Sequence, residues 1–318
     1  MTTPLKWHEE TTEANPPDTY RTVLEDSVPP LVDVSWLERH IGERGLVVLD
    51  ATYPLPMIDD PRQVYRAIHL PTARLLDFSR ISLLLEPLPR LVPSPQTFLR
   101  AMGSLGVDSA THVIVYDQHG LTFGASRIWW LLRLFGHDRV SVLNGGLTAW
   151  INSGLSCAQG KPEELAEELE ELEEELDVKT PVDCRFVPHP SMIVSPLQTE
   201  HALHTGTATV VDARPVALYS GEAPDMLPHV TPGHIPGSLN LPFHDLLDGP
   251  SARLLSPDGI AARLEAAGVP ATSPVIATCS LGVAACTLAL ALQTIGRRWS
   301  VHDAGLEGWQ ARQTSAAT

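Results

Sequence analysis

The sequence has little positive charge and no long apolar run. Its 318 residues include 22 Lys and Arg against 38 Asp and Glu, which gives a formal net charge of −16. Nucleic-acid backbones and anionic membrane surfaces bind clusters of Lys and Arg, so this balance argues against either as a main partner. No apolar run reaches the roughly 18 residues that a membrane helix needs, and we expect no membrane span.

Cysteine is also scarce. The chain has four, and their number and spacing fit neither a disulfide framework nor a CxxC metal pattern: Cys157, Cys184, Cys279 and Cys286. Residues 1–30 lack the apolar core of a secretory signal and the Arg-rich, acid-poor character of a transit peptide. We therefore expect a cytoplasmic protein without a structural metal, whose N-terminal extension ends at Pro29-Pro30.

What the chain does have is globular composition and enough length for two domains. Apolar residues make up 43% of it and charged residues 19%, which excludes a wholly disordered chain. The negative charge is concentrated, because the run EELAEELEELEEELD at 163–177 holds nine Glu and one Asp with no Lys or Arg. The rest of the chain is only mildly acidic.

An internal repeat of about 160 residues divides the chain into two similar halves. LVVLDATY around Asp50 corresponds to TVVDARPV around Asp212, and AIHLPTARLLDF corresponds to GHIPGSLNLPF. The segment ending at Asp117 corresponds to the segment ending at Cys279, and VSVLNGGLTAW corresponds to WSVHDAGLEGW. Four matches in the same order at nearly one offset predict a duplicated domain.

Each half alternates short apolar runs with segments of helical spacing. The expected strands are 46–49, 112–116 and 140–143 in the first half, and 209–211 and 275–278 in the second. Segments 96–105 and 259–267 have helical spacing. This alternation predicts an α/β fold in which each domain is a mainly parallel sheet flanked by helices, with its ligand site beyond the carboxyl ends of the strands.

The acidic run lies between the two halves, in a linker over 158–190. Leu165, Leu169, Leu172 and Leu176 recur at spacings of four, three and four, so a helix would place them on one stripe. We favour a solvated linker helix laid against one domain; a partner-binding or dimerising helix is the alternative.

Cys279 is the candidate nucleophile. It follows the apolar run 275–278 and precedes the helical segment that begins near Val283, so it would face the amino terminus of a helix. Backbone N–H groups and the helix dipole favour a sulfur anion there, and we expect them to lower the thiol pKa from its free value of about 8.5. Gly282 would let the backbone curl around the sulfur.

With these motifs the sequence resembles the tandem-domain rhodanese family, the thiosulfate and 3-mercaptopyruvate sulfurtransferases. The resemblance covers about 31–157 and 191–312 and rests on VVLDATY, HLPTA, RIWWLLRLFGHDRVSVLNGGLTAW, VVDAR, GHIPGSLNLPF and CSLGVAAC. It implies two rhodanese-like domains, 31–157 and 191–318. The second would be catalytic through Cys279, and the first inactive because Asp117 stands at the cysteine position.

The resemblance also implies the chemistry. Cys279 would take a sulfane sulfur from thiosulfate or 3-mercaptopyruvate, hold it as a persulfide, and pass it to a thiol or cyanide. A thioredoxin-like reductant is a further candidate partner, and no metal or organic cofactor is required. The loop that would cradle the persulfide is formed by five residues: Ser280, Leu281, Gly282, Val283 and Ala284.

The loop departs from both family patterns. Ser280 and Leu281 occupy the two specificity positions, which therefore lack the hydroxyl of the mercaptopyruvate loop and the cations of the thiosulfate loop. Ala284 replaces a threonine, and Leu218 stands where the family has a substrate arginine. An anionic donor would find fewer cationic partners, so the sequence leaves both donors open.

Three residues are candidate substrate contacts, each with a structural alternative. His69 matches a residue that activates a loop serine in the mercaptopyruvate enzymes, with Asp59 or Asp60 as its neighbour. Because Leu281 replaces that serine, we favour a structural His69. Arg214 could pair near the site, and Arg127 could compensate for the missing cations.

Other conspicuous residues are interpreted as structural. We expect His234 to fix the turn before Pro236-Gly237, and Cys286 to be a small buried residue, with a resolving thiol as the alternative. Four tryptophans are expected to pack in the core: Trp129, Trp130, Trp150 and Trp309.

Two other functions are alternatives to sulfur transfer. A non-catalytic or regulatory rhodanese module that has lost donor recognition would be consistent with Leu218 and Leu281. Phosphatases of the same fold use a cysteine followed by five residues and an arginine, but the sixth position after Cys279 is Ala285. Without that bidentate cation, phosphatase chemistry is disfavoured.

Overall fold

The computed structural model describes residues 28–54, 60–81, 83–85, 88–90, 92–160, 188–249 and 251–316. The chain separates into two compact units, of which the first holds the described residues up to Pro188 and the second those from His189. The described residues do not include most of the N-terminal extension, the acidic run 163–177 with its expected linker helix, Cys184 or Asp59. No helix among the residues described is long and apolar enough to cross a membrane.

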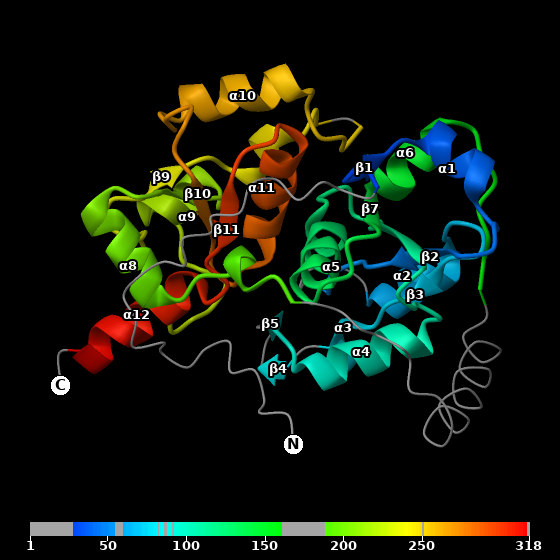
Figure 1. Cartoon of the computed structure of the whole chain (residues 1–318), viewed down its shortest axis with the longest axis horizontal. Coiled ribbons are helices and arrows are strands. Elements are labelled where there is room, and N and C mark those ends of the chain that lie inside the picture. The colour runs from blue at the N-terminus through cyan, green and yellow to red at the C-terminus, as the bar shows by residue number, and fades with distance from the viewer. Residues whose placement is uncertain are drawn as a thin grey trace. The chain divides into compact units, whose positions relative to one another are not determined.

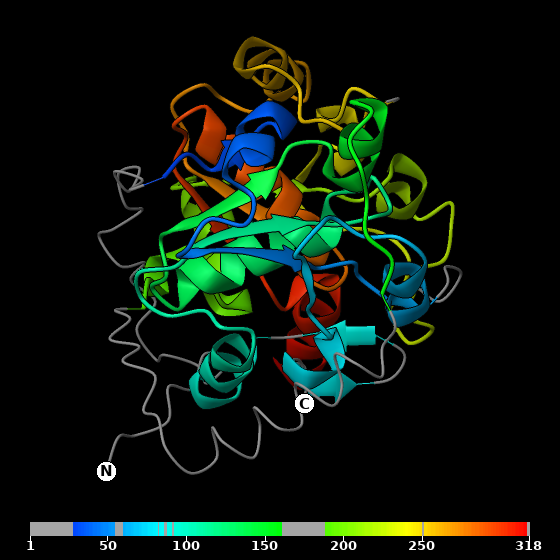
Figure 2. The same ribbon diagram turned by 90° about the vertical axis from the view of Figure 1, so that its right-hand side faces the viewer.

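The first domain is built on a five-stranded parallel sheet in the order β1-β7-β6-β2-β3, which faces the viewer in Figure 2. Its strands are β1 (Leu31–Val32), β2 (Leu46–Asp50), β3 (Arg74–Leu75), β6 (His112–Tyr116) and β7 (Val140–Leu143). A separate antiparallel pair is formed by β4 (Leu83–Leu85) and β5 (Leu88–Arg90). The helices are α1 (Val34–His40), α2 (Pro61–Ala67), α3 (Phe78–Ile81), α4 (Pro95–Ser104), α5 (Phe123–Leu134) and α6 (Gly146–Asn152).

The second domain repeats this plan with four parallel strands in the order β11-β10-β8-β9. They are β8 (Thr209–Asp212), β9 (Leu239–Asn240), β10 (Val275–Thr278) and β11 (Trp299–Val301). The helical segments are η1 (Pro190–Met192), α8 (Pro196–Thr205), α9 (Val216–Ser220), η2 (Phe243–Leu246), α10 (Pro257–Ala266), α11 (Val283–Thr294) and α12 (Gly305–Ala316).

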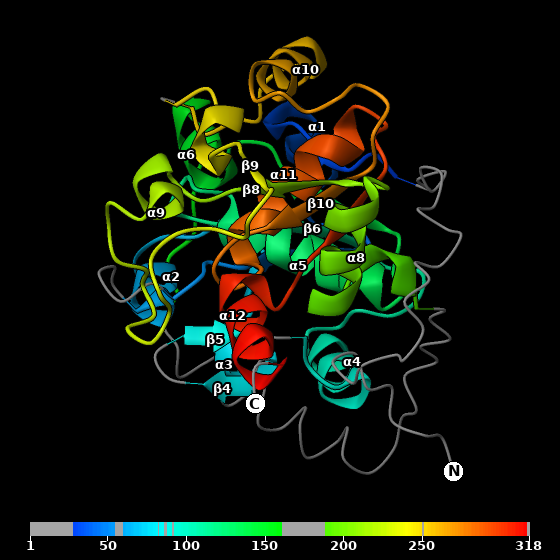
Figure 3. The same ribbon diagram turned by 90° about the vertical axis from the view of Figure 1, so that its left-hand side faces the viewer.

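Helices cover both faces of the second sheet, as Figures 1 and 3 show. α11 packs on β10 and β11 with α10 beside it, while α8 packs on β8 with α12 beside it. Nearly every residue of α11 is buried because its sequence, VAACTLALALQT, is apolar almost all round. The sequence prediction of two parallel-sheet α/β domains is confirmed, including the five expected strands and helices α4 and α10.

The strand orders of the two sheets match, as the sequence repeat predicts. β7, β6, β2 and β3 of the first domain correspond in position to β11, β10, β8 and β9 of the second. The first domain adds β1, which pairs with β7, whereas the second has only a bridge between Ile193 and Val301 there. The predicted packing tryptophans are buried, since Trp129 and Trp130 are 0% exposed.

The boundaries of the first domain extend slightly beyond the expected ones. The carbonyl of Pro30, assigned to the extension, accepts a hydrogen bond from Val142 N on β7. At the other end, Ala158 pairs with His69 and Gly160 N donates to Arg66 O. The chain therefore stays packed on the first domain as far as Gly160, beyond the expected end at residue 157.

Candidate active site

Cys279 lies directly after β10, one of the two central strands of its sheet. Thr278 at the end of β10 is level with Asp212 at the end of β8, and Ala213 N donates to Thr278 O at 2.8 Å. The carboxyl ends of parallel strands therefore meet here, where α/β folds place their ligands. Cys279 is 3% exposed in this structure.

A tight loop connects the cysteine to helix α11. Gly282 adopts a left-handed conformation with φ of +74°, and α11 begins at the next residue. The backbone N–H groups of Leu281 and Ala285 form hydrogen bonds to the Cys279 sulfur and act to lower its pKa. Amides at the start of a helix thus face the sulfur. Leu281 belongs to the predicted loop of residues 280–284, whereas Ala285 lies one residue beyond it.

The net pKa shift of Cys279 has the opposite direction from the prediction. Burial raises the pKa of the Cys279 thiol above its ordinary value, and the amides of Leu281 and Ala285 offset this only in part. The charge of Asp212 raises the pKa further, and that of Arg214 lowers it. The prediction of a lowered thiol pKa is therefore wrong. Removing the thiolate from water destabilises it by more than the hydrogen bonds from these amides stabilise it.

The start of α12 contacts the backbone of the cysteine loop, residues 279–282. Leu306 N donates to Cys279 O at 2.8 Å, and Gly305 packs so closely that a Cβ there would lie 2.6 Å from Cys279 O. Gly282 is equally confined, because a Cβ there would lie 2.5 Å from Asp303 Oδ1. Glycine at both positions allows the two loops to meet at backbone distance.

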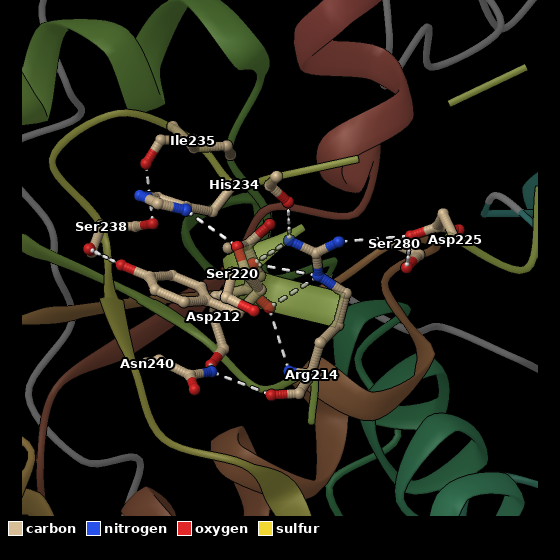
Figure 4. A network of polar contacts seen from close by, with 12 residues as sticks. Asp212, Arg214, Ser220, Asp225, His234, Ile235, Ser238, Asn240 and Ser280 are labelled. Atoms are coloured by element: carbon tan, nitrogen blue, oxygen red, sulfur yellow. Dashed lines mark hydrogen bonds and ion pairs between the residues drawn. The ribbon is translucent and has the colours of Figure 1, made fainter. Parts of the chain in front are cut away.

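Arg214 is the centre of a buried polar network beside this loop (Figure 4). Its Nε lies 3.0 Å from each carboxylate oxygen of Asp212, and its Nη2 lies 2.6 Å from Asp212 Oδ2. Nη2 also donates to Gly233 O at 2.8 Å, and Nη1 to Asp225 Oδ2 at 3.2 Å. Burial opposes the charge of Arg214, but the two carboxylates outweigh it and raise its pKa.

The second loop residue is tied into the same network. Ser280 Oγ donates to Asp225 Oδ2 at 2.6 Å, and both residues are buried. Asp225 Oδ1 accepts from Leu227 N at 3.1 Å, which fixes the carboxylate on its own backbone. One carboxylate oxygen thus joins the cysteine loop to Arg214.

His234 has contacts of a structural kind. Its ring stacks on Tyr219 with centroids 3.9 Å apart, and its Nδ1 lies 2.9 Å from Tyr219 O. Tyr219 in turn donates its hydroxyl to Ser238 O, on the turn that precedes β9. These contacts hold the turn in the way the sequence predicts.

The first domain has a comparable cradle that holds a carboxylate. Asp117 follows β6 and accepts backbone hydrogen bonds from Ala125, Thr122 and Gly120. Burial, and next the charge of Asp50, raise the pKa of Asp117 to about 7 despite these bonds. Asp117 therefore occupies the position that the sulfur occupies in the second domain.

The other two substrate candidates belong to the first domain and have structural contacts there. His69 stacks on Tyr65 with centroids 4.0 Å apart, and its Nδ1 lies 2.8 Å from Tyr65 O. The guanidinium of Arg127, which is 3% exposed on α5, lies 4.6 Å from the centroid of the Trp130 ring. Asp60, considered as an acidic neighbour of His69, instead caps α2.

Two other cysteines, Cys157 and Cys286, are among the described residues. Cys286 is 0% exposed, and its thiol donates to Gly282 O, four residues earlier on α11. Cys157 is half-buried. Within the described residues, no group of three or more His, Cys, Asp or Glu could hold a metal ion.

Sequence reasoning missed Asp225, Asp303 and Gly305. Asp225 lies 55 residues from Ser280, and nothing in the local pattern links the two. Gly305 could have been found from the repeat, because its counterpart Gly146 packs against Asp117 O in the first domain.

Comparison with known proteins identifies the family. A model of the rhodanese-like domain matches the chain twice, at residues 33–153 and 195–312. The chain belongs to the rhodanese family. Its two matched segments lie within the two domains described above, and the resemblance seen in the sequence motifs is confirmed.

Two curated rhodanese relatives match most of the chain. The 3-mercaptopyruvate sulfurtransferase of Escherichia coli K12 is 35% identical over 284 residues, which are 88% of this chain and 95% of the relative. The mitochondrial thiosulfate/3-mercaptopyruvate sulfurtransferase 1 of Arabidopsis thaliana is 32% identical over 299 residues, 91% and 78% of the two chains.

A solved rhodanese structure agrees with the fold. The crystal structure of SseA from Escherichia coli, a 3-mercaptopyruvate enzyme, matches with a TM-score of 0.72 and 32% identity. The match covers 87% of this chain and 99% of SseA. With the curated relatives, this makes the protein a sulfurtransferase.

Proposed function

We propose that the protein moves a sulfane sulfur from thiosulfate or 3-mercaptopyruvate to a thiol or cyanide through a persulfide on Cys279. The observation that supports this most strongly is the convergence of the Leu281 and Ala285 amides on the Cys279 sulfur at the start of α11. Both donors are named in the relatives, and a thioredoxin-like reductant is a further candidate partner.

The first half-reaction loads the cysteine. The Cys279 thiolate attacks the outer sulfur of thiosulfate, forms a sulfur–sulfur bond and releases sulfite with the electron pair of the broken bond. With 3-mercaptopyruvate, the carbon–sulfur bond breaks instead, and the electron pair leaves as the enolate of pyruvate, which then takes up a proton. The loop amides hold the anionic sulfur throughout.

The second half-reaction unloads it. An acceptor thiolate attacks the outer sulfur of the persulfide, and the inner sulfur leaves as the Cys279 thiolate. Cyanide attacks the same sulfur and leaves as thiocyanate. No net oxidation is needed, because the sulfur moves in one oxidation state between nucleophiles.

A donor panel tests this proposal. Wild-type protein is given thiosulfate or 3-mercaptopyruvate with cyanide or a thiol, and thiocyanate or sulfide is measured. We expect turnover with at least one donor, its loss in Cys279→Ser, and its retention in the matched control Cys286→Ala, which removes the other thiol of the same segment. Turnover that survives Cys279→Ser would contradict the proposal.

The alternative to turnover is a non-catalytic rhodanese module, which the sulfurtransferase relatives disfavour. The observation in its favour is that the Arg214 guanidinium is bound by Asp212 and Asp225 while Leu281 is buried on the loop, which leaves an anionic donor little to bind. Turnover that Cys279→Ser abolishes would exclude it.

A further inference from the structure

We propose that Asp225 is a positioning and specificity-determining residue of the Cys279 site. In this account, which rests on the proposed function, its carboxylate ties the cysteine loop to Arg214 and takes up the charge of that arginine. The site therefore accepts a singly charged sulfur donor more readily than a doubly charged one.

The tether is a set of short contacts among buried groups (Figure 4). Ser280 has one hydroxyl hydrogen, and it is donated to Asp225 Oδ2 at 2.6 Å. The same oxygen lies 3.2 Å from Arg214 Nη1, and the side chains of Arg214 and Asp225 are 3% and 1% exposed. A hydrogen bond to a buried carboxylate restrains its donor strongly, so the residue after Cys279 is held in one place.

The first domain has the same kind of tether at the matching position. Gln118, the residue after Asp117, donates its Nε2 to Asp50 Oδ2 at 2.5 Å. In both copies, then, the residue after the loop's key side chain is bound to a buried carboxylate. The copies differ in charge, because the second domain has Arg214 where the first has Thr52. The tethered position thus belongs to the shared loop, although its carboxylate differs, because Asp50 matches Asp212 and not Asp225. The ion pair belongs to the copy with the cysteine.

The positive charge of Arg214 near Cys279 is neutralised by neighbouring carboxylates. Asp212 and Arg214 at the end of β8 both act on the sulfur, and Asp225 is bound to the same guanidinium. Two further groups directly follow β11. The carboxylate of Asp303 packs near Gly282, and burial lowers the pKa of His302 to about 4, so His302 is neutral at pH 7. Arg214 therefore faces two carboxylates that outnumber it, and a second negative charge on a donor is repelled.

Two variants separate the tether from the charge. Asp225→Asn keeps an oxygen that can accept from Ser280 but removes the negative charge. Ser280→Ala removes the tether and changes no charge. Ser251→Ala is the matched control, because Ser251 also donates its hydroxyl to an aspartate, Asp248, in an exposed turn of the same domain. Ser280→Thr restores a hydroxyl and should recover part of what Ser280→Ala loses.

The experiment measures kcat and KM with thiosulfate and with 3-mercaptopyruvate, and the pH dependence of Cys279 alkylation followed on its own peptide. For Asp225→Asn we expect the KM for thiosulfate to fall about threefold to tenfold, the KM for 3-mercaptopyruvate to fall less, and the alkylation midpoint to move down by about 0.5 to 1 pH unit. For Ser280→Ala we expect kcat to fall about tenfold with both donors and the midpoint to stay unchanged. Ser251→Ala should match the wild type.

An unchanged alkylation midpoint together with an unchanged donor preference in Asp225→Asn would overturn the charge role. An unchanged kcat in Ser280→Ala would overturn the positioning role. This variant alters no buried charge, so it tests positioning even where Asp225→Asn does not fold. Absence of turnover in the wild type would instead count against the proposed function, since alkylation reports on the Cys279 thiol without any donor.

Discussion

At Cys279, two physical effects act on one thiol in opposite directions. The amides of Leu281 and Ala285 stabilise the thiolate, but burial raises the thiol pKa by more than these amides lower it. The location of Cys279 could be predicted from sequence because strand, loop and helix are adjacent in the chain. The direction of its pKa shift could not, because burial depends on residues from the whole domain.

The raised pKa of Cys279 predicts how its reactivity depends on pH. The thiolate is the reactive form, so the fraction that reacts grows as the pH rises toward the raised pKa of the folded protein. We expect the alkylation rate by iodoacetamide, followed on the Cys279 peptide, to rise about tenfold per pH unit from pH 7 to 8.5. A plateau reached below pH 7.5 would show that the amides outweigh burial.

Among the elements, the loop after β10 depends on its contact with the start of α12. Gly305 has φ of +60° and lies against the carbonyls of Cys279 and Ser280. Gly206, at the end of α8, has a similar φ of +67° but no atom within 4 Å of where a Cβ would be. The two glycines therefore separate backbone strain from close packing.

Alanine at these two glycines should have unequal effects. Gly206→Ala should cost about 1 kcal/mol of the free energy of unfolding, from the left-handed conformation alone. Gly305→Ala should cost about 3 kcal/mol and lower kcat, because the added Cβ displaces the cysteine loop. Chemical denaturation and steady-state rates measure both. Equal losses of stability would contradict the role given to the loop contact.

The elements that sequence predicted best are those with their own burial pattern. β2, β6, β7, β8 and β10 are four or five residues of apolar sequence, and each was expected as a strand. The two-residue strands β1, β3 and β9 were not predicted. Two residues are too few to show an alternating apolar pattern, and such a segment is a strand only because it pairs with a neighbouring strand. The antiparallel pair β4–β5 was missed for a related reason, since only pairing defines it.

At the scale of the whole molecule, one fold has been used twice with different charges at the loop. The second domain holds a thiol next to Arg214, and the first holds Asp117 next to Asp50, with Thr52 at the position that matches Arg214. The repeat could be predicted from sequence, and the inactivity of its first copy stays a prediction. The network through Asp225 could not, because it joins residues that only the folded sheet brings together.

The raised pKa of Asp117 predicts a pH-dependent stability of the first domain. Between about pH 4 and about pH 7 the folded state keeps a proton that the unfolded state has lost, so stability falls as the pH rises through this window. Asp117→Asn removes the buried charge, and calorimetry should show a melting temperature higher by about 5 °C at pH 8 and a much smaller difference at pH 4.

Asp108 provides the opposite case in the same domain. Hydrogen bonds from the Thr111 hydroxyl and the Ala110 amide lower the pKa of Asp108. Its charge therefore contributes stability that is fully present above the ordinary carboxyl pKa and is lost as the pH falls through the lowered pKa. Asp108→Asn should therefore lower the melting temperature at pH 8. A gain in Asp108→Asn, or none in Asp117→Asn, would contradict this account of the two carboxylates.

The most direct test of the central claim is peptide mass spectrometry of the wild-type protein after exposure to thiosulfate and, separately, to 3-mercaptopyruvate. The account predicts the mass of one added sulfur on the peptide that contains Cys279, with at least one donor, and its removal by cyanide. Fragmentation should place that sulfur on Cys279 and not on Cys286. An unmodified Cys279 with both donors, or a sulfur on Cys286 alone, would contradict it.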